Sequence, residues 1–366
     1  MKRIYIWQDD EWPRFRWDSR RLLKPLGEVR QLQGRVAGMM DVLGFDVRGN
    51  LGVSALTDDI MSSSAIEGVT LNADSVRSSV ARRLGVEADG VIACDHYVEG
   101  LVDIMMDAVG NASAPLTEER LFGWHSALFP TGRSGMVRIT VGGWRIGDEP
   151  MQVVSGAFGH EEVHYEAPAS SDVPCEMARF LKWASSTDTD PLVCAAVAHL
   201  WFVTVHPFDD GNGRISRTVA DMFLSRADVG GGRFYSMSAE ILRRKKSYYE
   251  ILERTQKGSL DITEWILWFL DCLCISLGRS IEAVETVCRK GRWWERFRDV
   301  EVNERQRKVI NRLWDGFDGK LTTSKWAKIC HCSQDTAGRD IRDLISKGML
   351  LDSGERGRST NYLLAE

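Results

Sequence analysis

Nine residues, HPFDDGNGR at positions 206–214, combine the side chains that phosphate chemistry needs. His206 is a candidate general base near neutral pH. Asp210 is a candidate Mg²⁺ ligand, because Mg²⁺ prefers a carboxylate together with phosphate oxygens. Arg214 and Arg217 lie three residues apart, so on a helix they share a face and present two forked cations to phosphate. The spacing therefore predicts a site for a nucleotide polyphosphate.

These side chains need two helices to position them. Residues 193–205 are apolar on nearly every side, which is typical of a central buried helix, and Pro207 ends that helix. Phe208 is expected to anchor the loop in the core. The turn Gly211-Asn212-Gly213 then opens a second helix, whose free N–H groups and dipole attract anions. The alternative is a capped turn between two helices with solvated charges.

The stretch resembles the Fic motif, HxFx(D/E)GN(G/K)R with a second Arg three residues later, and similarity to Fic sequences covers roughly residues 55–285. The resemblance implies a mainly α fold, a helical-bundle core with a β-hairpin flap. It also implies a protein adenylyltransferase that moves AMP from ATP to a Ser, Thr or Tyr hydroxyl of a target protein or of itself. The implied roles are His206 as base, Asp210 as Mg²⁺ ligand, Gly211, Asn212 and Gly213 around the phosphates, and Arg214 and Arg217 on the β and γ groups. Asp209 falls at the variable position of the motif, so we expect it to be solvated.

A second stretch, SSSAIEGV at positions 62–69, places Ser63 four residues before Glu67, which is followed by Gly68. Alone it predicts a serine-rich helix end with a glycine cap. It resembles the Fic inhibitory motif, (S/T)xxxE(G/N), which implies that Glu67 pairs with Arg217 and that ATP then binds unproductively. In some family members the same Glu supports removal of AMP from the target by positioning a water. The sequence leaves the direction of the reaction open.

Residues 151–168 alternate in hydropathy and resemble the Fic flap, which aligns a target segment by strand pairing. The alternative is an ordinary surface hairpin. Tyr248 and Tyr249 are adjacent on an expected helix and point different ways, so one belongs to the core. By resemblance Tyr248 faces the adenine, and Gln256 stands where the family often has Asn.

Two further patterns suggest metal sites, and we favour neither. HEEVH at positions 160–164 fits the zinc-protease pattern HExxH, but that chemistry needs a helix and this sequence alternates like a hairpin. Cys330-His331-Cys332 is closely spaced, yet a zinc site would need a second ligand cluster.

The pattern of elements predicts three parts. Residues 1–50 form a Trp-rich helical region, residues 51–290 form the Fic core with an inhibitory helix around 57–68, and residues 300–366 form a winged helix-turn-helix. The first part has a helix near 19–43, and the core gains a helix from about residue 56.

The C-terminal part carries little net charge. Residues 301–366 hold 12 Lys and Arg against 10 Asp and Glu, about +2, which is mild for DNA binding. Thr336, Arg339 and Arg342 would face outward from the recognition helix, and residues 354–360 would form the wing. We favour a structural or protein-contact role. The competing hypothesis is a DNA-binding regulator whose Fic core only senses nucleotide, but the complete motif favours the enzyme.

Overall composition narrows the class of protein. The net charge is −5 and 43% of residues are hydrophobic, so nothing global indicates nucleic acid or membrane. The most apolar run, 193–205, is too short to span a bilayer, and the acidic, aromatic N-terminus is unlike a secretory signal. Eight scattered cysteines fit a reducing cytoplasm. A homodimer is left open.

Overall fold

The computed structural model describes residues 5–87, 95–155, 162–228, 230, 232–317, 319–353 and 361–365. In these residues the chain is mainly helical, with short two-stranded antiparallel sheets, and the predicted mainly α class is confirmed. The chain divides into unit 1, Met1–Ile281, and unit 2, Glu282–Glu366. None of the helices in the described part of the chain combines the length and apolarity that a membrane crossing requires.

Unit 1 contains most of the helices and two of the hairpins. Its helices are α1 (Ser19–Asp41), α2 (Phe45–Ile66), α3 (Ala73–Leu84), α4 (His96–Gly110), α5 (Glu118–Leu128), α6 (Val173–Ser186), α7 (Pro191–Val205), α8 (Asn212–Ala227), α9 (Met237–Arg243), α10 (Lys245–Gln256) and the first part of α11 (Thr263–Arg296). Short 3-10 helices are η1 (Ile6–Gln8) and η2 (Ser170–Asp172). The strands pair as β1 (Arg133–Ser134) with β2 (Val137–Arg138), and β3 (Gln152–Ser155) with β4 (Glu162–Glu166).

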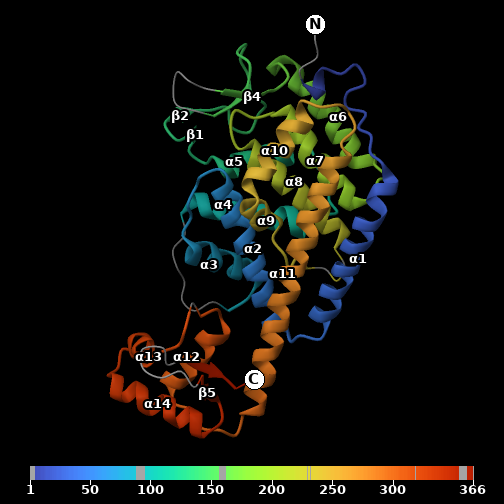
Figure 1. The fold of residues 1–366 in the computed structure, drawn as a ribbon. Helices are drawn as coiled ribbons and strands as arrows, with labels where there is room; N and C mark the ends of the chain where they lie inside the picture. The colour runs from blue at the N-terminus through green and yellow to red at the C-terminus, as the bar shows by residue number, and fades with distance from the viewer. Residues whose placement is uncertain are drawn as a thin grey trace. The chain divides into compact units, whose positions relative to one another are not determined.

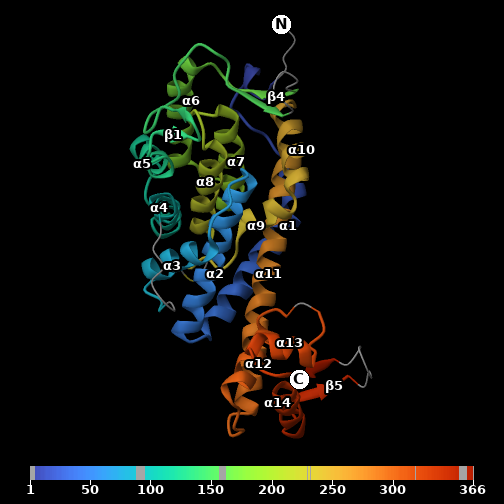
Figure 2. The same cartoon turned by 90° about the vertical axis from the view of Figure 1, so that its left-hand side faces the viewer.

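Helix α7 forms the centre of unit 1. Every residue from Leu192 to Val205 is buried, as a helix that is apolar all round requires. Asp190 caps it by accepting the Leu192 N–H at 2.8 Å, and Pro191 occupies its first turn. Figures 1 and 2 show α7 and α8 between α5 on one side and α11 on the other. The expected pair of helices around the turn is therefore present.

Two elements differ from the sequence prediction. Helix α2 begins at Phe45 rather than near residue 56, because Gly44 is the extended N-cap and the buried face continues through Val53 and Leu56. Helix α9 was not predicted, since seven residues carry too little periodicity to identify it. Its start is fixed by Ser236, whose hydroxyl accepts the Ala239 N–H at 2.9 Å.

The N-terminal segment lies against the β3–β4 hairpin. The indole of Trp7, in η1, donates to the carbonyl oxygen of Glu166 at 2.8 Å. The ring of Tyr5 packs edge-on against Tyr165, with centroids 5.2 Å apart. Aromatic residues of this segment therefore cover the hairpin, and β1 and β4 lie at the same end of unit 1 (Figures 1 and 2).

Unit 2 has the helix and strand order that the sequence predicts for its C-terminal part. Its elements are α12 (Glu304–Trp314), α13 (Thr323–Cys330), α14 (Gln334–Ser346), β5 (Leu350–Asp352) and β6 (Tyr362–Leu364). Trp293 and Phe297, near the end of α11, join its core with Trp326, which explains why the unit begins before residue 300. The expected wing, residues 354–360, lies outside the described residues.

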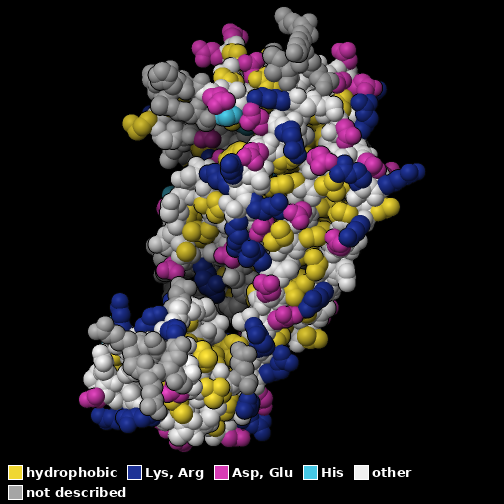
Figure 3. Space-filling view, viewed as in Figure 1, with side chains coloured by type: hydrophobic (Ala, Val, Ile, Leu, Met, Phe, Trp, Pro, Cys, Tyr) yellow, Lys and Arg dark blue, Asp and Glu magenta, His cyan; other side chains and the backbone are white. Residues whose placement is uncertain are grey.

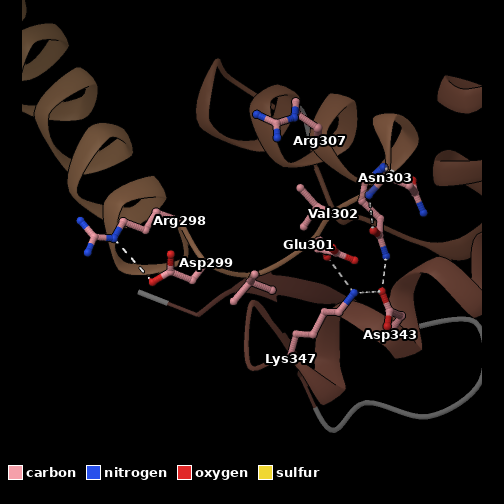
Figure 4. A pocket seen from close by; sticks show the side chains of 10 residues that line it. Arg298, Asp299, Glu301, Val302, Asn303, Arg307, Asp343 and Lys347 are labelled. Atoms are coloured by element: carbon pink, nitrogen blue, oxygen red, sulfur yellow. Dashed lines mark hydrogen bonds and ion pairs between the residues drawn. The ribbon is translucent and has the colours of Figure 1, made fainter.

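Unit 2 encloses a polar cavity of about 630 Å³ (Figure 4). Lys347 crosses it and donates to the Glu301 carbonyl oxygen at 2.9 Å and to the Asp343 carboxylate at 2.6 Å. The amide of Gln306 donates to the Asp343 carboxylate at 2.7 Å. Side chains of the cavity wall therefore satisfy one another.

Candidate active site

The motif loop, residues 206–213, lies in the wall of a cavity of about 760 Å³ in unit 1. The β3–β4 hairpin and α10 supply other walls. The predicted site residues that line it are Glu67, His206, Asp210, Gly211, Asn212, Gly213, Tyr248 and Gln256. The predicted residues Ser63, Arg214 and Arg217 are not in this lining. The structure thus brings the expected base, metal ligand and glycine turn together at the cavity, whereas both arginines lie outside its lining.

His206 caps the end of α7 in the left-handed region, with φ of 51°. Its Nδ1 lies 2.7 Å from the carbonyl oxygen of Val203. A carbonyl only accepts, so Nδ1 carries the proton and Nε2 keeps its lone pair.

The surroundings of His206 lower the pKa of its imidazole below the ordinary 6.5. Burial is the main cause, and the hydrogen bond to Val203 opposes it. The Arg145 cation lowers the pKa further, whereas the carboxylates of Glu67 and Asp210 raise it. Because the lowering prevails, the imidazole is neutral at pH 7 and able to accept a proton.

Phe208 and Asn212 hold the motif loop in shape. Phe208 is fully buried, as expected, and stacks on His125 with ring centroids 4.1 Å apart. The side-chain oxygen of Asn212 accepts the Phe208 N–H at 2.9 Å, and its amide donates to the Phe208 carbonyl at 2.8 Å. Both ends of the Asn212 side chain brace the loop from within, whereas the resemblance had implied a place beside the phosphates.

Two glycines meet close neighbours in the loop. Gly211 has φ of +81°, and a Cβ there would lie 2.7 Å from Leu128. At Gly213, in the first turn of α8, a Cβ would lie 2.2 Å from Oε1 of Glu67. The Glu67 carboxylate therefore rests on the N-terminal turn of α8, where the free N–H groups and the helix dipole favour an anion.

The two aspartates of the loop differ in their partners. Asp210 is about two-fifths exposed, accepts the Gly211 N–H at 2.5 Å and is also hydrogen-bonded by the Ser134 hydroxyl of β1. Asp209, which was expected to be solvated, is partly exposed and lines the cavity, but it also has a protein partner. Its carboxylate accepts the Thr140 N–H at 2.7 Å, so it fastens the chain after β2 to the motif loop.

Arg217 is paired with the inhibitory stretch. Its Nη2 lies 2.8 Å from Oε1 of Glu67, and its Nε donates to the Ser63 hydroxyl at 2.9 Å. The Arg217 side chain is 2% exposed, against 31% for Glu67. Burial alone would lower the pKa of Arg217, but the nearby Glu67 carboxylate raises it, so the guanidinium stays charged.

Arg214 also has a protein partner. Its Nη1 donates to the Tyr97 hydroxyl of α4 at 2.7 Å, and its guanidinium lies over the Phe129 ring, 5.2 Å from the centroid. The side chain is 9% exposed. Nothing in the local sequence indicates this pairing, because Tyr97 is more than a hundred residues away.

The tyrosine pair divides as expected into one core ring and one outer ring. Tyr248 is buried and its hydroxyl lies 2.8 Å from Nε2 of His199, whose pKa burial lowers to about 3. Tyr249 is 42% exposed and lines the same cavity. Gln256 donates to the Thr204 hydroxyl at 3.3 Å. Of the two rings, Tyr249 offers the more accessible face.

The HExxH pattern falls only partly within the described residues. His160 and Glu161 lie outside them, and His164 belongs to strand β4, with Nδ1 3.1 Å from the carboxylate of Glu253. In the part of the chain that the structure describes, no three His, Cys, Asp or Glu side chains gather as a metal site.

Comparison with known proteins identifies two segments. Residues 115–224 match the Fic/DOC family, and residues 5–86 match a family described as a domain of unknown function, DUF4172. The protein adenylyltransferase Fic of Drosophila yakuba is 30% identical over 126 residues, which are 33% of this chain and 24% of that protein. The Drosophila melanogaster protein of the same name gives the same values. The chain therefore spans about a quarter of these relatives.

Solved structures resemble most or nearly all of this chain. A Fic family protein from Desulfovibrio desulfuricans has a TM-score of 0.54 and 21% identity, covering 94% of this chain and 95% of that one. A Fic-domain signalling protein from Bacteroides thetaiotaomicron has a TM-score of 0.52 and 20% identity, covering 70% of this chain and 97% of that one. At these identities the likeness shows the fold.

Proposed function

We propose that this chain, whose residues 115–224 match the Fic/DOC family, is a protein adenylyltransferase, which moves AMP from ATP to a Ser, Thr or Tyr hydroxyl of a target protein or of itself. The observation that carries the proposal is the geometry of His206. Its Nδ1 is held by a carbonyl at 2.7 Å, so the neutral Nε2 is available in a cavity that Asp210 and the α8 N-terminus also line.

The reaction follows from these groups. Nε2 of His206 takes the proton of the attacking hydroxyl, whose oxygen forms a bond to the α-phosphorus of ATP while the bond to the β-phosphate oxygen breaks and pyrophosphate leaves. The N–H groups at the first turn of α8 bind the phosphate oxygens. The motif loop thus aligns base and phosphate on the same side of the cavity.

Asp210 fits a Mg²⁺ site. It is a single carboxylate, partly exposed in the cavity, and the Ser134 hydroxyl orients it from β1. One carboxylate completed by phosphate oxygens and water is the donor set that Mg²⁺ uses in nucleotide sites. When bound there, Mg²⁺ would neutralise charge on the phosphates.

Glu67 is proposed as the restraint on this reaction. Its carboxylate occupies Arg217 and the first turn of α8, both of which the terminal phosphate of ATP would need. A like charge at that place repels the phosphate. The wild-type chain is therefore expected to be weakly active.

Removal of AMP from a modified protein is the second candidate function. Glu67 lines the cavity and is only partly buried, so its carboxylate has room to orient a water. A DNA-binding regulator is less well supported, because residues 301–366 carry about +2 and charges of both signs intermingle on the face of unit 1 in Figure 3. The described cysteines are free, which supports a reducing, cytoplasmic location.

Labelled ATP tests the proposal. Wild type, Glu67→Gly and the double variant Glu67→Gly/His206→Ala are incubated with α-labelled ATP and Mg²⁺, alone and with candidate protein extract. Label is expected on protein with Glu67→Gly and not with the double variant. Release of AMP from labelled protein by wild type, but not by Glu67→Gly, would favour the second function. No labelling or release by any form would overturn both.

A further inference from the structure

We propose that Arg145 is a positioning residue for His206, which fixes the motif loop against the chain that follows the β3–β4 hairpin. This inference rests on the proposed function for its catalytic meaning. Arg145 lies between β2 and β3 and is not part of the Fic motif. Its side chain is buried, and all its hydrogen bonds named below go to main-chain carbonyls.

Arg145 joins two parts of the chain at one point. Its main-chain N–H donates to the Pro207 carbonyl at 2.9 Å, and its Nε donates to the His206 carbonyl at 2.7 Å. Its Nη2 donates to the carbonyl of Pro168, two residues after the end of β4. One residue therefore holds two consecutive carbonyls of the motif loop and one at the base of the hairpin.

The motif loop needs such a donor at this place. His206 stands in the left-handed region, which a residue with a Cβ adopts only when its surroundings enforce it. Pro207 has no N–H of its own to contribute a stabilising bond. The planar guanidinium presents donors at fixed angles, so it sets the direction of the His206 carbonyl and with it the backbone that carries the imidazole.

The charge of Arg145 also affects the pKa of His206. Burial lowers the pKa of the Arg145 guanidinium, and the nearby Asp209 carboxylate raises it in part, yet in the described part of the chain no carboxylate lies within ion-pair distance of it. Three charged side chains act on the His206 imidazole from the surrounding elements: Arg145 from the β2–β3 connection, Glu67 from α2 and Asp210 from the motif loop. Among these, only Arg145 favours the neutral base.

Two substitutions separate position from charge. Arg145→Lys keeps the positive charge but replaces the rigid guanidinium with one flexible ammonium group. Arg145→Met removes both the charge and the hydrogen-bond donors. Arg179→Met is the matched control, because Arg179 also donates to a main-chain carbonyl, that of Trp12, away from the cavity. All are made in the Glu67→Gly chain, and each is checked by thermal unfolding.

Transfer is measured at saturating ATP across pH 5 to 8, with the affinity for a fluorescent ATP analogue measured separately. For Arg145→Met we expect turnover to fall by about 100-fold, the loss typical of a misplaced catalytic group, with affinity for the analogue unchanged. In the pH profile of turnover for Arg145→Met, the decline toward acid should occur at a higher pH than in the Glu67→Gly chain. Arg145→Lys loses part of the turnover and keeps this decline in place, and Arg179→Met changes neither.

The His206 imidazole is also titrated by NMR in each variant without nucleotide, so the inference has a readout independent of transfer. A rise in the pKa of His206 in Arg145→Met, absent in Arg145→Lys, supports it. The inference is overturned if Arg145→Met changes neither the pKa of His206 nor the turnover. It is also overturned if Arg145→Met weakens analogue binding and lowers the unfolding temperature while the pH profile of transfer and the His206 titration stay where they were. Failure of Glu67→Gly itself to label protein would overturn the proposed function and leave the NMR result to decide on Arg145.

Discussion

The two halves of the motif at residues 206–217 are held in different ways. On the histidine side, the His206 Nδ1 donates to the Val203 carbonyl and the Arg145 side chain donates to the His206 carbonyl, and among the described residues none is hydrogen-bonded to the Nε2 of His206. On the arginine side, Arg214 donates to Tyr97 and Arg217 pairs with Glu67. Under the proposed function, the base is therefore available while both arginines have protein partners. The comparison indicates that a restraint by Glu67 would act mainly on nucleotide binding, although its carboxylate also raises the pKa of His206.

Burial makes the arginine side costly to disturb. The Arg217 side chain is 2% exposed, so removing Glu67 leaves a charged group in the interior with neutral partners, among them Ser63 and Tyr248, in place of a carboxylate. A buried charge that loses its partner is strongly unfavourable. Under the proposed function, the terminal phosphate of ATP would supply a new anionic partner, which would couple release of Glu67 to nucleotide binding.

The largest effect is expected on the histidine side. His206→Ala in the Glu67→Gly chain should lower transfer by about 10²- to 10⁴-fold, the usual contribution of a general base. Binding of a fluorescent ATP analogue should be unchanged, because the arginine side is intact. Retention of transfer within a few-fold would show that His206 is not the base.

Removing the restraint should have the next largest effect. Glu67→Gly should raise labelling roughly 5- to 150-fold, the range typical of a coupling between two sites. Glu250→Gly is the control, since Glu250 lines the same cavity and is not paired with either motif arginine. Equal rises in the two variants would mean that general loss of negative charge, and not release of Arg217, activates the chain.

The pH profile reports the histidine side alone. Because the pKa of His206 lies below 6.5, its neutral form persists as the pH falls, and the midpoint of the acid decline in transfer by Glu67→Gly should lie below pH 6.5. Rates at saturating ATP across pH 5 to 8 check the prediction. A midpoint above pH 6.5 would contradict a lowered pKa.

The smallest effect is expected at Tyr97. Tyr97→Phe in the Glu67→Gly chain frees Arg214 for phosphate and should tighten ATP-analogue binding about 2- to 12-fold, the equivalent of one hydrogen bond of ~0.5–1.5 kcal/mol. Calorimetric titration measures it. Weaker binding in Tyr97→Phe would mean that Tyr97 orients Arg214 for the nucleotide, and the two halves would then differ only at Arg217.

The local sequence predicted the helices and the loop at the centre of the site. The apolar run before His206, the proline after it and the glycine turn define α7, the motif loop and α8, because each signal acts within a few residues. The start of α5 depends on a signal of the same local kind, since Thr117 accepts the Arg120 N–H at 3.2 Å.

Contacts between distant residues could not be foreseen in the same way. Asp209 has the local look of a solvated side chain, yet Thr140 meets it from another part of the chain. Tyr97 and Arg145 belong to no recognisable motif. Each acquires its role because the fold places it against a motif residue, Tyr97 against Arg214 and Arg145 against His206. The pairing of Glu67 with Arg217 was anticipated only through family resemblance, since 150 residues separate the two.

The contact between Glu67 and Gly213 limits which residue position 213 can hold while Glu67 stays in place. Oε1 of Glu67 lies where any side chain at position 213 would begin. A residue with a side chain at position 213, such as the lysine that the motif also admits there, would therefore require the flexible Glu67 carboxylate to shift away from the first turn of α8. Position 213 thus sets how closely Glu67 can approach that turn, although the two residues belong to segments that match different families.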